Sequence, residues 1–192
     1  MTQRMHKILE KIAQWKVAIV LAVSAFGFFA IFNFHHAVVP ALLKSSSGVP
    51  PLDMQWAYGV KEISSLFSAY GIEGRQRYAA FLVADTLFAV TYGLFFAALL
   101  RLLLRPLVPL SSSRWNLLVL LPLLAAAADC VENIGILALL GTYARIPRAL
   151  AYTASTATMI KWLLASAGIC AIVTVVGLRL ACRVRHRCAL SL

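Results

Sequence analysis

Four long runs of apolar residues divide the chain, and polar or turn-forming residues separate them. The runs extend over residues 17–39, 78–104, 115–140 and 153–180. A helix of about 20 residues crosses the hydrocarbon core of a bilayer, so each run is long enough to span one. We therefore predict an all-α, polytopic membrane protein in which residues 1–192 form a single transmembrane domain of four helices.

The segment between the first two runs, residues 40–77, is the sizeable stretch outside the predicted spans. Apolar positions recur there at steps of four and three, at Trp56, Val60, Ile63, Phe67 and Tyr70. This spacing predicts an extracytoplasmic amphipathic helix over residues 56–70, ended by Gly71 and Gly74. The helix is expected to lie at the membrane interface, either as a plug on the bundle or as a lid over a cavity, and a plug is the commoner arrangement.

The composition agrees with a chain that is embedded in lipid. Hydrophobic residues make up 61% of the chain and charged residues 13%, and the mean hydropathy is +0.84. Soluble domains are about half apolar and about a quarter charged. The net charge of +11 is a feature of nucleic-acid-binding proteins too, but here the basic residues stand at the ends of apolar runs. We therefore expect membrane lipid as a partner and no nucleic acid.

Lysine and arginine are unequally divided between the two sides of the predicted bundle. The amino-terminal segment, the second loop and the tail carry eleven: Arg4, Lys7, Lys11, Lys16, Arg101, Arg105, Arg114, Arg179, Arg183, Arg185 and Arg187. The first and third loops carry six: Lys44, Lys61, Arg75, Arg77, Arg145 and Arg148. Because the richer side is normally cytoplasmic, we predict that both termini are cytoplasmic and that the protein lies in the inner (plasma) membrane.

Ionisable residues interrupt three of the predicted spans. They are Asp85, Asp129, Glu132 and Lys161. At the rise of a helix, all of them lie about 10 to 16 Å below the outer ends of their spans. A charge inside a bilayer is costly, and it commonly marks a functional site or a buried ion pair. We therefore predict one polar layer in the outer half of the membrane.

Helical spacing adds further polar side chains to this layer. Tyr78 and Tyr92 stand seven residues before and after Asp85, and Asn133 lies on the face of Asp129. Three carboxylates and one ammonium do not balance, so we expect at least one protonated carboxylate, or a positive charge from the long side chain of Arg75 or Arg77. The candidate ligand-binding or proton-exchange residues are Asp85, Asp129, Glu132, Asn133, Lys161, Tyr78, Tyr92 and Arg77.

Metal and cofactor chemistry is not expected. Carboxylate and amide oxygens suit Mg²⁺ or Ca²⁺, but the ammonium of Lys161 in the same layer opposes a bound cation. Zinc prefers imidazole or thiolate ligands. His35 and His36 stand at the outer end of the first run, where we expect interface residues, and the four cysteines form no C-x-x-C pair. We therefore expect no metal and no cofactor.

One motif resembles a pattern in known membrane proteins. Its residues are Asp129-Cys130-Val131-Glu132-Asn133, preceded by Leu121-Pro122, with Asp85 and Tyr92 upstream and Lys161-Trp162 downstream. This pattern resembles a group of small bacterial four-helix integral membrane proteins with a D-x-x-E-N motif in the third helix. The resemblance implies four helices and no particular activity. A weaker likeness is to EXPERA-type bundles, in which acidic residues bind amphiphilic ligands, and it assigns no residue of this chain.

Three functions are compatible with these patterns. The leading hypothesis is a membrane protein whose polar layer binds an amphiphilic or small polar ligand, with proton exchange at the carboxylates. A second is an intramembrane lipid-modifying enzyme that uses Asp85, Asp129 or Glu132 as acid–base groups. A third is a structural or accessory subunit in which the charges pair internally. A cavity that opens from the layer to the outside or sideways to lipid would distinguish them.

Overall fold

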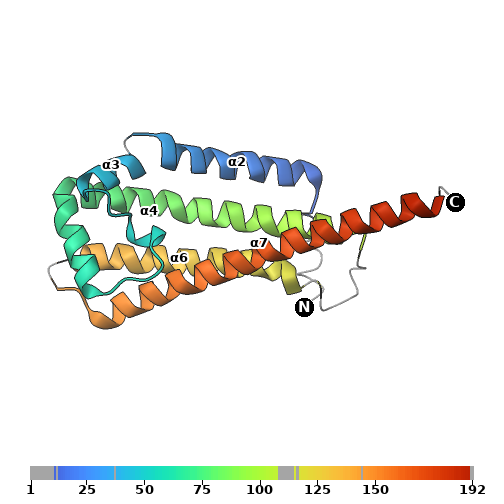
Figure 1. The fold of residues 1–192 in the computed structure, drawn as a ribbon. Coiled ribbons are helices and arrows are strands. Elements are labelled where there is room, and N and C mark those ends of the chain that lie inside the picture. Colours follow the sequence, from blue (N-terminus) through green and yellow to red (C-terminus); the bar gives the residue numbers. More distant parts are fainter. Residues whose placement is uncertain are drawn as a thin grey trace.

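A computed structural model of the chain describes residues 11, 13–36, 38–107, 115, 117–143 and 145–190, with side chains described up to residue 182. Its elements, in chain order, are α2 (Trp15–Phe34), α3 (Val39–Ser45), η1 (Leu52–Met54), α4 (Val60–Leu104), η2 (Leu117–Val119), α6 (Leu120–Gly141) and α7 (Arg148–Leu190) (Figure 1). The basic residues Arg4, Lys7 and Arg114 and the side chains of Arg183, Arg185 and Arg187, which entered the topology prediction, lie outside these described residues.

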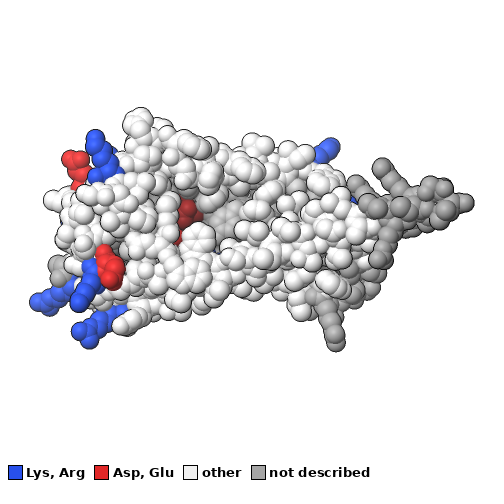
Figure 2. All heavy atoms as spheres, in the orientation of Figure 1, with Lys and Arg blue, Asp and Glu red and all other residues white. Residues whose placement is uncertain are grey.

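The predicted all-α fold with four helices of membrane-spanning length is confirmed. The four helical segments that are long and apolar enough lie within Trp15–Ser45, Val60–Leu104, Leu117–Gly141 and Arg148–Cys182. Figure 1 shows α2, α4, α6 and α7 running lengthwise along the bundle. On the face drawn in Figure 2, most coloured side chains gather at the end near α3, and the long side is almost free of charge. This distribution suits a bundle surrounded by lipid.

The predicted amphipathic helix is the first part of α4. It begins at Val60, because the Gly59 N–H donates to Glu62 Oε2 at 2.9 Å and caps the helix there. The amphipathic helix ends at Gly71 as predicted, whereas Gly74 belongs to the helical segment that follows. Gly71 has a φ of 62° and a ψ of −168°, a non-helical conformation that glycine adopts easily, and this kink separates the amphipathic helix from the spanning helix within α4.

The part of α4 before the kink lies across the end of the bundle (teal in Figure 1). Its buried apolar face comprises Ile63, Leu66, Phe67 and Tyr70. Trp56 was predicted to belong to this face, but it precedes the helix and is 54% exposed. The helix therefore packs on the end of the bundle through a core that does not include Trp56.

Helix α6 packs closely against both α4 and α7 because small residues stand at the contacts. A Cβ atom added at Gly93 would lie 2.5 Å from the Cβ of Ala126, and one added at Gly135 would lie 2.9 Å from the Cβ of Ala154. This close approach turns the polar face of α6 towards both of its neighbours, and the candidate site forms there.

Candidate functional site

Lys161 of α7 is at the centre of a buried ion-pair network. Its Nζ lies 2.5 Å from Glu132 Oε2 and 3.3 Å from Asp129 Oδ1, and it donates to the backbone carbonyl of Asp53 at 2.9 Å. The side chain of Lys161 is 9% exposed, that of Asp129 6% and that of Glu132 0%. Lys161 therefore makes two hydrogen bonds, to Asp129 and to the Asp53 carbonyl, and a close ion pair with Glu132.

The second carboxylate oxygen of Glu132 is also engaged. The hydroxyl of Thr158 lies 2.6 Å from Glu132 Oε1 and 3.2 Å from the hydroxyl of Tyr58. Glu132 therefore joins α6 to α7 through an ammonium at one oxygen and a hydroxyl at the other. A buried carboxylate with partners at both oxygens is typical of a structural ion pair.

Asp53 belongs to the same layer, although the sequence pattern did not indicate it. It lies in η1, outside the helices that are long enough to span a membrane, yet the residue is only 5% exposed. The Tyr78 hydroxyl donates to Asp53 Oδ1 at 2.7 Å. Lys161 binds the backbone carbonyl of Asp53 rather than its carboxylate. The carboxylate of Asp53 thus has a neutral hydrogen-bond donor.

The segment around η1 covers one end of the polar layer. Leu52 is fully buried, the Tyr58 N–H donates to Ser155 Oγ at 3.0 Å, and the Trp162 Nε1–H donates to the carbonyl of Gln55 at 3.1 Å. These contacts hold the segment on α7. A plug or lid was predicted in residues 56–70, and two parts of the segment before α4 reach the layer: η1 through Asp53, and Tyr58 through Thr158.

Asp85 lies on α4 within the same layer and has a neutral partner. Its Oδ2 accepts a hydrogen bond from Asn133 Nδ2 at 3.0 Å, and none of the lysines and arginines in the described part of the chain forms a salt bridge with it. Asn133 is fully buried, and its Oδ1 lacks a hydrogen-bond partner among the described residues. A side-chain amide can donate to a carboxylate and, after rotation, accept from a carboxylic acid, so Asn133 suits both protonation states of Asp85.

The two tyrosines of the predicted stripe contact different carboxylates. Tyr92 donates to Asp129 Oδ2 at 2.8 Å, so both oxygens of Asp129 are engaged, one by Tyr92 and one by Lys161. Tyr78 is fully buried and contacts Asp53 instead of Asp85. The structure therefore brings together seven of the predicted residues: Tyr78, Asp85, Tyr92, Asp129, Glu132, Asn133 and Lys161.

Arg77 lies away from this layer. Its side chain is 55% exposed and 3.9 Å from Glu73, one helical turn earlier, so it contributes no charge to the buried carboxylates. The neighbouring Arg75 donates to the carbonyl of Phe67 and lies 4.1 Å from the centre of the Tyr143 ring. His35 and His36 are exposed just beyond the end of α2, and their rings stack on each other at 4.7 Å.

A cleft of about 670 Å³ opens beside the polar layer. Its lining includes Asp53, Asp85, Asp129 and Lys161, and its walls are rich in aromatic side chains: Phe26, Phe29 and Phe32 of α2, Phe81 and Phe88 of α4, and Trp162 of α7. Figure 2 shows carboxylates at the bottom of a depression on the long side of the bundle. The cleft therefore opens sideways, between helices, rather than at the end of the bundle.

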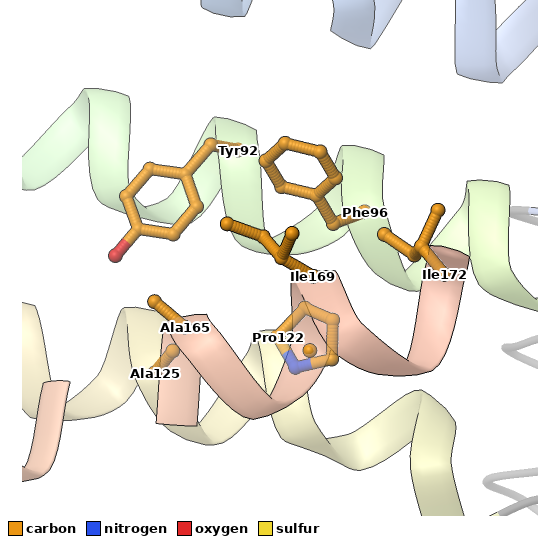
Figure 3. A pocket seen from close by; sticks show the side chains of 8 residues that line it. Tyr92, Phe96, Pro122, Ala125, Ala165, Ile169 and Ile172 are labelled. Carbon is orange, nitrogen blue, oxygen red and sulfur yellow. The ribbon is translucent and has the colours of Figure 1, made fainter. Parts of the chain in front are cut away.

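A smaller apolar recess of about 50 Å³ adjoins the cleft (Figure 3). Side chains of α4, α6 and α7 surround it, among them Pro122, Ala125 and Ile172. Four residues line both spaces: Tyr92, Phe96, Ala165 and Ile169. In Figure 3 the hydroxyl of Tyr92 points away from Phe96 and Ile172. The lining thus changes from carboxylates in the cleft to aliphatic and aromatic groups in the recess.

Burial changes the acidity of two groups in the segment between α3 and α4. Removal from water raises the pKa of Asp53 above its ordinary value of 3.8, and the nearby ammonium of Lys161 and the hydrogen bond from Tyr78 oppose this shift only in part. Burial also raises the pKa of Tyr58. Protonation of Asp53 is therefore easier in the folded protein than in the unfolded chain.

Comparison with known proteins yields no match of this chain to a protein-family model, to a curated protein or to a solved structure. The functional argument therefore rests on the cleft and the polar layer.

Proposed function

We propose that the protein binds an amphiphilic ligand, which enters the cleft sideways from the bilayer. The observation that carries this proposal is a cleft on the long side of the bundle with aromatic walls and carboxylates on its floor. A wholly polar ligand would leave the aromatic walls unused, and a hydrocarbon would leave the carboxylates without partners. A volume of about 670 Å³ falls in the range of small-molecule pockets, which is roughly 300–1,000 Å³.

The polar layer has two parts with different roles in this proposal. Lys161 and Glu132, with Asp129, form a structural ion-pair network between α6 and α7. Asp53 and Asp85 line the cleft and receive hydrogen bonds from neutral groups. These two carboxylates are the ligand-facing groups of the site, and Asp85 with Asn133 is the pair suited to proton exchange.

The aromatic rim provides the route from lipid. Phe26 is 67% exposed and Phe29 is 50% exposed, and both line the cleft from α2. In a bilayer these rings contact lipid chains on one side and the cleft on the other. We place the protein in the inner membrane with cytoplasmic termini, because of the unequal distribution of Lys and Arg.

The proposal is tested by filling the cleft. Ala165 lines both the cleft and the recess, whereas Ala167 is an exposed alanine on the same helix that lines neither. Ala165→Phe should remove ligand that copurifies with the protein in a mild neutral detergent, as measured by native mass spectrometry. The matched control Ala167→Phe should retain it.

Both variants are first compared by thermal unfolding, so that loss of ligand is separated from loss of folding. Equal retention of ligand by the two folded variants would show that the bound molecule is not in the cleft. Loss in Ala165→Phe alone would agree with the proposal.

A further inference from the structure

The charges around the cleft point to the chemical class of the ligand's head group. We infer that the amphiphile carries a cationic ammonium head group, which lies on the floor of the cleft beside Asp85 and Asp53. This inference rests on the proposed function and adds the charge of the ligand to it.

The carboxylates of the layer outnumber its cations. Asp53, Asp85, Asp129 and Glu132 supply four acidic groups, and within the described part of the chain Lys161 is the cation that pairs with them. Lys161 contacts the carboxylates of Asp129 and Glu132. Asp53 and Asp85 line the cleft with neutral donors as their partners. A buried carboxylate needs a proton or a cation, and a ligand in the cleft is placed to provide the cation.

An anionic head group would find no matching donor in the described residues of the cleft. Lys161 is the cationic residue of the lining, and it already donates hydrogen bonds to Asp129 and the Asp53 carbonyl and forms an ion pair with Glu132. A phosphate or carboxylate would have to displace one of these acceptors and would lie beside two further carboxylates. The floor therefore favours a positive charge over a negative one.

The walls of the cleft agree with an ammonium group. Aromatic rings from three sides line the cleft, including Phe32, Phe88 and Trp162. The face of an aromatic ring attracts a cation within about 6 Å of its centre, most strongly where water is excluded. Alkylated ammonium groups combine this attraction with apolar methyl groups, which aromatic walls accommodate. Aromatic walls and an acidic floor together are typical of sites for such cations.

The position of the apolar recess indicates how the ligand is oriented in the cleft. The recess adjoins the cleft through Tyr92 and Ile169 and carries no carboxylate in its lining. A head group beside Asp85 leaves the hydrocarbon chain next to Phe96 and the recess, or directed out to lipid past Ile169.

The test compares probes that share a dodecyl chain and differ in their head groups. Dodecyltrimethylammonium, dodecanol and dodecanoate are added at low mole fraction to the full-length protein in dodecyl maltoside, and bound probe is measured by native mass spectrometry. Dodecyltrimethylammonium should bind at least about tenfold more tightly than dodecanol, which is the difference expected for one charge-assisted contact. Dodecanoate should bind most weakly of the three. This comparison uses the wild-type protein and does not depend on the folding of any variant.

Charge-removing variants locate the effect. Asp85→Asn and Asp53→Asn should each weaken binding of dodecyltrimethylammonium by about tenfold and leave binding of dodecanol unchanged. Glu73→Gln removes the same charge from a side chain that is 87% exposed and distant from the cleft lining, so it is the matched control and should bind like the wild type.

Two results would overturn the inference, and they are distinguishable. If dodecanol or dodecanoate binds as tightly as the cation, and Ala165→Phe still abolishes that binding, the cleft is a ligand site but its head-group class is not cationic. If no probe shows binding that Ala165→Phe abolishes, the proposed function fails as well.

Discussion

Removal of Lys161 should destabilise the protein strongly, because it leaves Glu132 buried without its ammonium partner. The Glu132 side chain is 0% exposed, and Lys161 Nζ is 2.5 Å from its Oε2. Breaking a buried pair by removing one partner typically costs about 3–5 kcal/mol. Lys161→Met also removes the donors to Asp129 and to the Asp53 carbonyl, so we expect a loss in this range.

A second substitution should restore much of this stability. Glu132→Gln keeps a side-chain oxygen for the Thr158 hydroxyl and removes the charge that Lys161→Met leaves unpaired. The double variant should therefore be less destabilised than the sum of the two single variants, with a coupling free energy of about 1–3 kcal/mol. Reversible unfolding in detergent of the wild type, both singles and the double variant measures this coupling.

Lys61→Met is the matched control, because Lys61 is exposed in the first turn of α4. It should change the free energy of unfolding by no more than about 0.5 kcal/mol. A cost of Lys161→Met as small as that of the control, together with no coupling to Glu132, would refute the structural role of the Lys161 network.

Three further results are expected. Asp53→Asn should flatten the pH dependence of stability: burial raises the folded pKa above 3.8, so the stabilisation from neutral Asp53 is complete below pH 3.8 and is lost as pH rises through the folded pKa. Thermal unfolding across the acidic range checks this, and a pH profile identical to that of the wild type would contradict it. Reporter fusions after Ser112 and at the carboxyl terminus should report the cytoplasm and a fusion near Ser46 the outside, and an external tail would reverse the topology. Phe67→Ala should lower the free energy of unfolding by about 3 kcal/mol, since Phe67 is 0% exposed, and chemical unfolding of the ligand-free protein measures it. Trp56→Ala, at an exposed position, should change it by no more than about 0.5 kcal/mol.

The spans could be predicted from hydropathy, because a membrane-spanning helix needs a long apolar run whatever it packs against. The start of the second span was harder to predict from the sequence. The predicted span began at residue 78, whereas the second helical segment of α4 begins directly after Gly71 and includes Gly74.

The helical members of the polar layer could also be predicted, because Asp85, Glu132 and Lys161 stand out within apolar runs. Asp53 could not, since an aspartate in a polar turn is ordinary. Its burial comes from tertiary contacts with Tyr78 and Lys161 that no local pattern encodes. The cleft could not be predicted from the sequence either, because the apolar faces of separate helices do not determine how far apart those helices lie.

An experimental structure of the protein in a lipid bilayer tests the central claim most directly. We predict elongated density in the cleft, with a polar head within about 3.5 Å of the Asp85 carboxylate and a chain that passes Ile169. The opposite result is a cleft that is closed by contact of α2 with α7, or filled by the protein's own side chains. That result would show that the carboxylates do not face a ligand site.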